Sequence, residues 1–511
     1  MTVKVLLIRP FYHLEKISCP TYIIEPLGLE YLASVIRNSH DVEIFDCIGE
    51  YWNKYKPIPS NPSLLHFGAS VNDVETKLKA FNPDLVGISS LFFTQGSCAH
   101  LIANVVKGID KSIITVIGGG HPSGYPKSVL RENRNLDIVV FGEGEETFKE
   151  LLDANAQNLE NIKGITYRKK DKIVKNESRS PIRNLDSIPF PSRDLVPYRN
   201  YSKMYNNTRK SVIIRTLNWM FTGTLFVDDV YYKCVNRVRR RFYPSSIRLP
   251  AGNIITSRGC PFRCYFCAVH SVWGNKYRMR SVKNVLDEIT LLHEKYKVKH
   301  ISIQDDNFTL SKKRAIKICK GVVEREFDLT FNAPSGVYVP SLDQELLLWM
   351  KKAGFYELWF GVESGNQTIL DNVINKKLIL SQVKEVAKIC KKVGIRTGGY
   401  FMIGVPGETK ENMKDTIRFA ATSNLDMARL YVCQPFPGSR LYEDCRNFGF
   451  LTDDFEHGKL KIFSDVSYIK TKEFSPTDVA EIVNEGRANL LQSGKLERFW
   501  KQEYFRNKDK N

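Results

Sequence analysis

The sequence predicts an α/β protein with two parallel-stranded units, a doubly wound sheet in residues 1–150 and a partial barrel of six strand–helix pairs in 251–445. Apolar strand-like runs alternate with amphipathic helical segments through both regions, which is typical of parallel sheets covered by helices. The chain has 511 residues, too many for one ordinary core. Its 42% apolar and 26% charged residues are typical of a globular protein.

The N-terminal unit opens with a continuous apolar run at 3–10, as expected of a strand covered on both faces. Further strands are expected at 41–46, 84–90, 112–120 and 137–145, with helices at 26–38 and near 73–81 and 97–110. Ligands of such sheets bind beyond the carboxyl ends of the strands. Polar or small residues stand at those ends and would let a large ligand approach the backbone. They are Arg9, Ser89, Ser90, Gly118, Gly119, Gly120, His121, Gly142 and Glu143.

Residues 151–250 connect the two units. The stretch 164–174 predicts a hairpin with a polar tip, and 181–194 predicts a linker punctuated by prolines. Residues 195–250 mix aromatic and basic residues without periodicity, and we interpret them as an insertion or lid. The tail, 446–511, is expected to be a charged helical extension.

Six strands are expected in the second unit, at 253–257, 300–306, 329–335, 357–364, 396–404 and 428–435. The helix predicted over 281–296 illustrates the segments between them, with Ser281 as N-cap and a buried stripe of apolar residues. That stripe comprises Val282, Val285, Leu286, Ile289 and Leu292. Such a barrel carries its reactive groups at the carboxyl ends of the strands.

Three cysteines stand just after the first of these strands, in SRGCPFRCYFCAV (257–269). These cluster cysteines are Cys260, Cys264 and Cys267. A structural zinc site needs four ligands, and His270, the alternative fourth ligand, follows Cys267 too closely for the usual paired spacing. A four-iron cluster fits better, with three irons held by the thiolates and the fourth left for an exchangeable ligand.

The cysteine spacing, with Phe266 before the last thiol, resembles the signature of radical S-adenosylmethionine enzymes. IQDDNFT (303–309), GVESGNQ (361–367), FMIGVPGET (401–409) and PFPGSRLYE (435–443) resemble later segments of the same family, in the same order. The resemblance implies a [4Fe-4S] cluster on the cluster cysteines, with S-adenosylmethionine at the open iron. It implies the following adenosylmethionine-binding residues, with Asp306 preferred over Asp305 for the ammonium group: Phe266, Asp305, Asp306, Glu363, Ser364 and Gly404.

PLGLEYLASVI, GISSLFFT, VIGGGHPSGYP and GEGEETF in the N-terminal unit resemble the Rossmann-like cobalamin-binding domain that precedes the barrel in one subclass. This resemblance implies that cobalamin contacts the strand-end residues named above, and Gly28. Many cobalamin enzymes supply cobalt with a histidine from an Asp-x-His-x-x-Gly segment, but His13 lacks both that aspartate and that glycine. We therefore expect no histidine ligand from this loop, and we expect His121 to contact a loop or the cofactor tail.

The family resemblance implies that one electron from the cluster cleaves adenosylmethionine to a 5′-deoxyadenosyl radical. Methylcobalamin would then methylate an unactivated carbon of a small molecule or natural-product intermediate. Cobalamin-dependent radical cyclisation or rearrangement, of the oxidative cyclase type, is the enzymatic alternative. An electron donor such as flavodoxin or ferredoxin is the expected protein partner.

The formal charge of +19 raises a non-enzymatic alternative, a cobalamin or iron–sulfur sensor that binds nucleic acid. Most lysines stand singly on amphipathic helices, so we expect no nucleic-acid partner. The apolar stretch at 217–227 is too short for a membrane helix, and the N-terminus has no export leader. The eleven scattered cysteines favour a reducing compartment, so we expect a cytoplasmic protein with no transmembrane segment.

Overall fold

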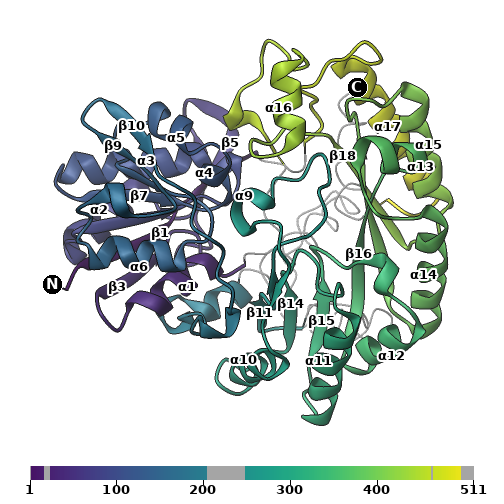
Figure 1. The fold of residues 1–511 in the computed structure, drawn as a ribbon, viewed down its shortest axis with the longest axis horizontal. Helices are drawn as coiled ribbons and strands as arrows, with labels where there is room; N and C mark the ends of the chain where they lie inside the picture. The colour runs from purple at the N-terminus through teal and green to yellow at the C-terminus, as the bar shows by residue number, and fades with distance from the viewer. Residues whose placement is uncertain (1, 16–23, 204–247, 462–463, 497–511) are drawn as a thin grey trace, which may run out of the picture.

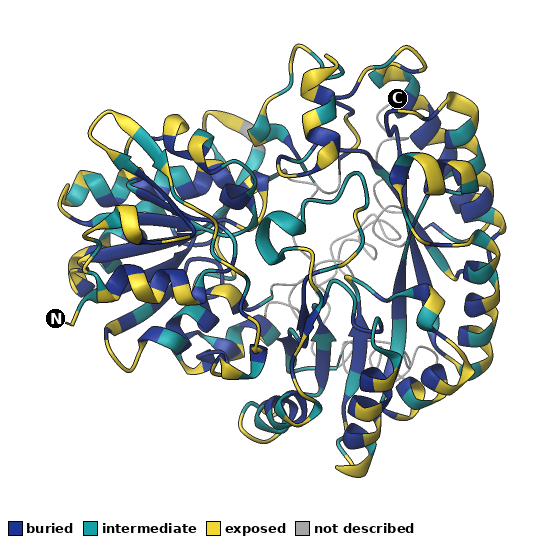
Figure 2. Ribbon diagram, viewed as in Figure 1, coloured by how far each residue is buried: buried dark blue, intermediate teal, exposed yellow. Residues whose placement is uncertain are grey.

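The computed structural model describes residues 2–15, 24–203, 248–461 and 464–496 (Figure 1). Two α/β units lie side by side, the N-terminal one in purple and blue and the second one in green. Their sheets form a buried interior, while the outer faces of the helices are exposed (Figure 2). The predicted fold class, a doubly wound sheet followed by a partial barrel, is confirmed.

The N-terminal sheet has seven strands in the order β10-β9-β8-β7-β6-β1-β3. They are β1 (Lys4–Arg9), β3 (Asp41–Asp46), β6 (Leu85–Ser89), β7 (Ile114–Gly118), β8 (Ile138–Val140), β9 (Ile165–Lys169) and β10 (Lys172–Lys175). The first five are parallel. The predicted hairpin adds β9 antiparallel to β8, and β10 antiparallel to β9, so this sheet extends beyond residue 150. Strand order reverses between β1 and β6, the switch point at which such sheets bind ligands.

Helices cover both faces of this sheet because β1 is apolar on both sides. Val5 and Leu7 pack in one core with α1 (Leu27–Ile36) and α6 (Glu145–Asp153). Leu6 and Ile8 pack in the other with α2 (Val71–Phe81), α3 (Gly96–Ile109) and α5 (Pro126–Glu132). The short α4 (Gly120–Gly124) follows β7. Because helices cover both faces of β1, the strand is apolar along its whole length, as the sequence predicted.

A second, three-stranded antiparallel sheet lies beside the first and was not predicted. It consists of β2 (Tyr12–Glu15), β5 (Asn61–Phe67) and β4 (Tyr55–Ile58), in the order β2-β5-β4. The strands are short, and Pro57 interrupts β4 at the sheet edge, where a missing N–H is tolerated. A turn signal, Pro59 and Ser60, stands between β4 and β5, but prolines at 57 and 62 argue against strands on either side of it.

The barrel sheet has six parallel strands in chain order, β11-β14-β15-β16-β17-β18. They are β11 (Ala251–Ile254), β14 (His300–Ile303), β15 (Thr330–Ala333), β16 (Phe355–Glu363), β17 (Arg396–Ile403) and β18 (Met427–Val432). The helices on its outer side are α10 (Val282–Glu294), α11 (Lys312–Glu324), α12 (Gln344–Lys352), α14 (Leu380–Val393) and α15 (Lys410–Thr422). The predicted N-cap of α10 is confirmed, since the Ser281 side chain accepts the N–H of Asn284. The two end strands do not pair with each other, so the barrel is open.

The remaining elements surround the carboxyl edge of this sheet. A two-residue hairpin of β12 (Ser257–Arg258) and β13 (Arg278–Met279) brackets α9 (His270–Trp273). The described C-terminal residues contain α16 (Arg440–Asn447) and α17 (Pro476–Gln492), with a 3-10 turn between them. Most of the predicted insertion, residues 204–247, and the end of the tail, 497–511, lie outside the described residues. Within the described part of the chain, no helix is both long and apolar enough to cross a membrane.

A buried arginine from the linker joins the two units. Arg193 is 1% exposed, and its Nη1 lies 2.8 Å from Glu288 Oε1 on α10. Its Nε lies 3.5 Å from Glu25 Oε1 and 4.0 Å from Glu30 Oε2, both at or near α1. Its Nη2 donates to the carbonyl oxygen of Asn253 on β11. One guanidinium therefore neutralises carboxylates from both units, and we call this group the Arg193 cluster.

Replacing Arg193 should destabilise the protein strongly. We expect Arg193→Met to lower the free energy of unfolding by about 3–5 kcal/mol, because it leaves buried carboxylates without a counter-charge. The measurement is the shift of the urea unfolding midpoint. Arg37→Ala is the matched control, since Arg37 pairs with Asp194 at the exposed surface of the same linker and should cost at most about 1 kcal/mol. Equal midpoints for the two variants would contradict the assignment.

Candidate active site at the facing strand ends

The loop that carries the cluster cysteines leaves the barrel at the carboxyl edge of its sheet. Gly259 makes the turn into the loop with φ +83°. A Cβ at this position would lie 2.3 Å from the carbonyl oxygen of Lys276, so only glycine fits. The loop is therefore held where such barrels present their ligands.

Hydrogen bonds fix the loop on both sides. Tyr265 donates its N–H to the carbonyl oxygen of Ile374 at 2.9 Å, and its own carbonyl oxygen accepts the N–H of Leu441 at 3.0 Å. Asn307 Nδ2 lies 3.3 Å from Cys260 Sγ. The loop is therefore tied to the segments that follow β14, β16 and β18.

The cluster cysteines are half-buried, and burial raises the pKa of each thiol, that of Cys267 to about 12. Such thiols lose their protons when a metal binds.

Among the residues that the structure describes, no three His, Cys, Asp or Glu side chains converge as ligands of a single ion. A four-iron cluster needs instead one thiolate for each of three irons. His270 Nε2 lies 3.0 Å from the carbonyl oxygen of Cys260, so it is engaged with the backbone. This donor set fits a cluster.

Two carboxylates follow β14, and they have different surroundings. Asp305 is 1% exposed, and its oxygens accept the N–H and hydroxyl of Thr256 and the hydroxyl of Ser257 at 2.5–2.6 Å. Asp306 is less buried and lies near two of the cluster cysteines. Burial and the charge of Asp305 raise the pKa of Asp306 to about 7. This geometry favours Asp306 as the carboxylate that faces the cluster loop.

β16 ends in a strained residue. Glu363 has φ +72°, which is costly for a residue with a Cβ, and the pairing with β17 shifts register at this point. Its Oε1 lies 3.2 Å from Lys376 Nζ. Ser364 is fully buried, and its hydroxyl lies 3.1 Å from Thr416 Oγ1. Of this predicted pair, Glu363 lies near the cluster loop and Ser364 packs inside the barrel wall.

Lys376 is a candidate that the sequence did not reveal. Burial lowers the pKa of its ammonium group, but the charges of Glu363 and Cys264 outweigh burial and raise it overall. Its side chain is 22% exposed, and it stands beside the exposed Lys377 in the sequence. Nothing in the run of two lysines distinguishes the one that faces the cysteines from the one that faces solvent.

A buried carboxyl group shapes the turn after β17. Gly404 has φ +86°, and the N–H groups of Gly404 and Val405 donate to Glu408 Oε2 at 3.0 and 2.8 Å. Burial raises the pKa of Glu408 to about 8. Phe266 is half-buried and packs against the barrel core. Gly404 and Phe266 thus both lie at the carboxyl edge of the barrel.

The predicted cobalamin residues on β6 and β7 come together at the carboxyl edge of the N-terminal sheet. Ser89 pairs with Gly118 across the two strands. Gly119 has φ +117°, and a Cβ there would lie 2.4 Å from the carbonyl oxygen of Ser90. A Cβ on Gly120 would lie 2.8 Å from the carbonyl oxygen of Leu91. The glycines therefore allow the loops after β6 and β7 to touch.

His121 has both ring nitrogens engaged within the domain. Nδ1 lies 2.8 Å from Ser90 Oγ, and Nε2 lies 2.7 Å from the hydroxyl of Tyr125. The side chain is 1% exposed, and burial lowers its pKa to about 3. The ring is therefore neutral, and neither nitrogen is directed at an open space.

Two further predicted cobalamin contacts, Arg9 and Glu143, are buried in ion pairs. Arg9 Nε and Nη2 lie 2.6 and 2.7 Å from the carboxylate oxygens of Asp46. Glu143 accepts hydrogen bonds from Arg258 and Arg278 of the barrel. In the structure these two charges join segments of the protein, and their contact with cobalamin stays a prediction.

The switch point of the N-terminal sheet exposes apolar side chains. Leu91 and Phe92, directly after β6, are 49% and 46% exposed. Gly28 is exposed on the first turn of α1, and no described atom lies within 4 Å of a Cβ placed there. Gly142 has φ +79° and leaves the end of β8 without a side chain. An edge with exposed apolar groups and bare backbone fits a large, flat macrocycle such as a corrin.

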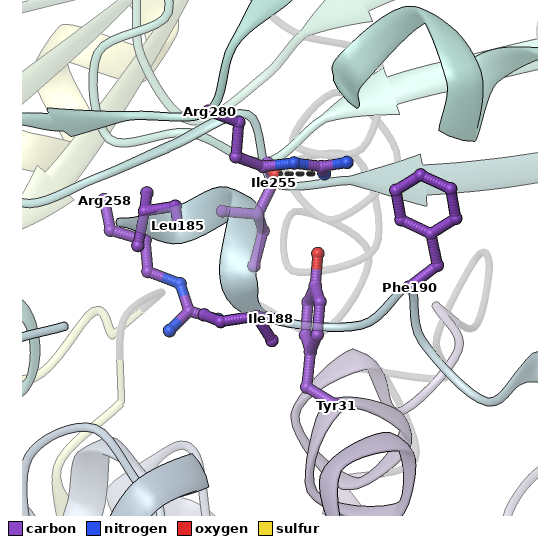
Figure 3. Close-up of a pocket in the computed structure, with 7 residues that line it drawn as sticks. All are labelled: Tyr31, Leu185, Ile188, Phe190, Ile255, Arg258 and Arg280. Atoms are coloured by element: carbon purple, nitrogen blue, oxygen red, sulfur yellow. Dashed lines mark hydrogen bonds between the residues drawn. The ribbon is translucent and has the colours of Figure 1, made fainter. Parts of the chain in front are cut away.

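A cavity lies between the two units, and Arg258, two residues before Cys260, is part of its lining (Figure 3). Its volume is about 10 Å³, room for about one water molecule, so it cannot hold a cofactor. Its lining residues are Tyr31, Leu185, Ile188, Phe190, Ile255, Arg258 and Arg280.

Residues 254–420 match the radical SAM superfamily, and residues 17–152 match the B12 binding domain. An uncharacterized methyltransferase from Pyrococcus horikoshii is 34% identical over 420 residues, which cover 82% of this chain and 78% of that protein. The chain belongs to the cobalamin-dependent radical S-adenosylmethionine enzymes. The cytidylyl-2-hydroxyethylphosphonate methyltransferase of Streptomyces wedmorensis is 31% identical over 462 residues, or 88% of this chain and 82% of that enzyme.

The fold of this radical SAM enzyme is similar to that of the methyltransferase TsrM from Kitasatospora setae, solved with cobalamin and a [4Fe-4S] cluster bound. The TM-score is 0.64 and the identity 17%, with 88% of this chain and 79% of TsrM covered. The predicted family is confirmed, and so are its cofactors, a [4Fe-4S] cluster, S-adenosylmethionine and cobalamin. Their individual contact residues stay predictions.

Removing one cluster cysteine should remove the cluster. We expect Cys264→Ala, reconstituted without oxygen, to lose most of its bound iron and sulfide, because two thiolates no longer hold three irons. Chemical assays of iron and sulfide measure this. Cys390→Ala is the matched control, since Cys390 is a buried thiol of α14 outside the loop, and it should retain the wild-type content. Full iron content in Cys264→Ala would contradict the assignment.

Proposed function

We propose that this enzyme transfers a methyl group to a carbon atom of a small molecule. The observation that carries the proposal is the 31% identity, over 88% of the chain, to a methyltransferase whose named substrate is a cytidylyl-linked phosphonate. The relative from Pyrococcus horikoshii also has a methyltransferase name.

The contact between the two units supports a shared reaction space. Gly124, the last residue of α4, packs on the carbonyl group of Pro437, which follows β18. Gly142, after β8, approaches Val272 in α9, just beyond the cluster cysteines. The carboxyl edges of the two sheets therefore face each other, with α9 between the units (Figure 1). Cofactors bound at the two edges would meet in one space.

When bound, the cluster supplies the electron that cleaves adenosylmethionine, and cobalamin carries the methyl group. The chain's own residues hold these groups in place. In our proposal the carboxylate of Asp306 accepts hydrogen bonds from the ammonium group of adenosylmethionine. Glu363 accepts hydrogen bonds from its ribose hydroxyls, and Lys376 fixes the orientation of Glu363.

Aromatic and cationic side chains supply a surface for the substrate inside the barrel. On β16 the alternate residues Leu358, Phe360 and Val362 pack outward in the core, so Trp359 points inward. It stacks on Tyr400 of β17 at 4.7 Å, and the guanidinium carbon of Arg429 lies 4.4 Å from its ring centre. We propose that part of the substrate lies near this group.

Loss of Lys376 should weaken the binding of adenosylmethionine. We expect Lys376→Met to raise the dissociation constant about 10- to 100-fold, because Glu363 loses the cation that orients it. Equilibrium binding to the reconstituted enzyme measures this constant. The neighbouring Lys377→Met, an exposed lysine, is the control and should bind as the wild type does. Unchanged affinity in Lys376→Met would remove Lys376 from the site.

Methyl transfer can be tested directly with adenosylmethionine labelled in its methyl group. We expect reduced enzyme, given cobalamin and cytidylyl-2-hydroxyethylphosphonate or related nucleotide-linked phosphonates, to place the label in product. Flavodoxin or ferredoxin would serve as the proposed electron donor. Deoxyadenosine with a cyclised or rearranged, unlabelled product would instead favour the cyclase alternative. Salt-dependent binding of nucleic acid without any cleavage of adenosylmethionine would favour the sensor.

A further inference from the structure

Two arginines flank the cluster loop and face each other across a short hairpin. Arg258 on β12 pairs with Arg278 on β13, and Arg258 stands two residues before the first cluster cysteine. Their side chains are 3% and 8% exposed. Two guanidinium groups with the same charge would not be buried side by side without carboxylates between them.

The carboxylates come from the other unit, at the start of α6. Arg258 Nη1 lies 2.9 Å from Glu143 Oε1, and Arg258 Nη2 lies 2.6 Å from Glu145 Oε1. Arg278 Nη1 lies 3.0 and 2.7 Å from the two oxygens of Glu143. We call these four residues the latch.

Both carboxylate oxygens of Glu143 accept two hydrogen bonds each. Besides the two arginines, its Oε2 accepts the N–H of Ile182 in the linker at 2.8 Å. Arg278 in turn donates to the carbonyl oxygens of Ile182 and Trp273 at 2.6 and 2.8 Å. One carboxylate thus fastens the hairpin, the end of α9 and the linker to the turn that follows β8.

The latch is separate from the Arg193 cluster, although both join the two units. The Arg193 cluster joins α1 to β11 and α10, whereas the latch joins the turn after β8 to the hairpin beside the cluster loop. β12 and β13 are two residues long and belong to neither large sheet. Besides the latch, Tyr31 of α1 contacts this hairpin, since its ring centre lies 5.3 Å from the guanidinium carbon of Arg258. A cavity of about 10 Å³ borders Arg258 (Figure 3).

We propose that the latch is a positioning device, which sets the place of the cluster loop relative to the cobalamin domain. Glu143, Arg258 and Arg278 touch neither substrate nor cofactor in this role; they hold the loop on which the cluster is bound. The inference rests on the proposed methyl transfer. Without the latch the enzyme still cleaves adenosylmethionine, but fewer cleavages end in methylated product, because the two cofactors are no longer in register.

The test compares Glu143→Gln with Glu146→Gln in the full-length reconstituted enzyme. Glu146 is the neighbouring carboxylate of the same helix turn, but its side chain is 56% exposed and outside the latch. Three quantities are measured: deoxyadenosine formed per methylated product, cobalamin retained, and hydrogen–deuterium exchange of residues 255–280. We expect Glu143→Gln to raise the ratio of deoxyadenosine to methylated product at least about tenfold, and to speed hydrogen–deuterium exchange in residues 255–280. The variant should retain cobalamin, and its deoxyadenosine formation should stay within about twofold of wild type.

Arg258→Lys is the milder variant should Glu143→Gln fold poorly. A lysine keeps the charge but cannot bridge Glu143 and Glu145 together, so its product ratio and exchange should lie between those of wild type and Glu143→Gln. Unchanged exchange in 255–280 in both variants overturns the proposal. Loss of cobalamin from Glu143→Gln with unchanged exchange also overturns it, in favour of direct cofactor binding. If even the wild type forms no methylated product, the proposed function fails, while the exchange data still decide the latch.

Discussion

Buried charges join the cobalamin domain to the radical SAM barrel, and the relation between the two cofactors depends on them. Arg193, Arg258 and Arg278 are largely inaccessible to solvent. Arg193, in the linker, is paired with carboxylates of both units, and Arg258 and Arg278 of the barrel are paired with carboxylates of the cobalamin domain. Burying such groups is costly unless both partners are present with good geometry. The interface therefore permits one relative placement of the two strand edges, whereas an apolar interface of the same size would tolerate sliding.

Backbone conformations that disfavour ordinary side chains gather at the same edges. Gly259 and Gly404 have positive φ where the chain leaves the barrel, and Gly119 has positive φ on the cobalamin domain. Glu363 has positive φ although it carries a Cβ, and its ion pair with Lys376 helps to hold it there. Strain of this kind persists where the surroundings over-determine a residue, and it is common at functional sites. At the carboxyl edges of the two sheets, chain segments can therefore pack closely together, and the strained residues lower the free energy of unfolding somewhat.

The two large sheets could be predicted because each strand–helix unit is a local pattern, readable within about thirty residues. The cluster cysteines could be predicted for the same reason, since their spacing is local. The three-stranded antiparallel sheet could not be predicted because β2 and β4 have only four residues each and because β4 and β5 contain prolines. The latch and Lys376 could not be predicted from the sequence, for a different reason. Glu143 and Arg258 stand 115 positions apart, and nothing in either neighbourhood indicates that they meet. The structure engages Arg9, Glu143 and Ser364 with other protein groups, which the sequence does not indicate because a polar residue at a strand end can face inward as well as outward; their contacts with the cofactors stay predictions.

The open barrel has a consequence for the size of molecule that the enzyme can accept. A closed barrel of eight strands fills its own centre with side chains and leaves room for a ligand only at its mouth. Here β11 and β18 are the two ends of the sheet, so the barrel is open along one side. A change in the length of the segments that follow the strands would alter the room for a ligand without altering any strand.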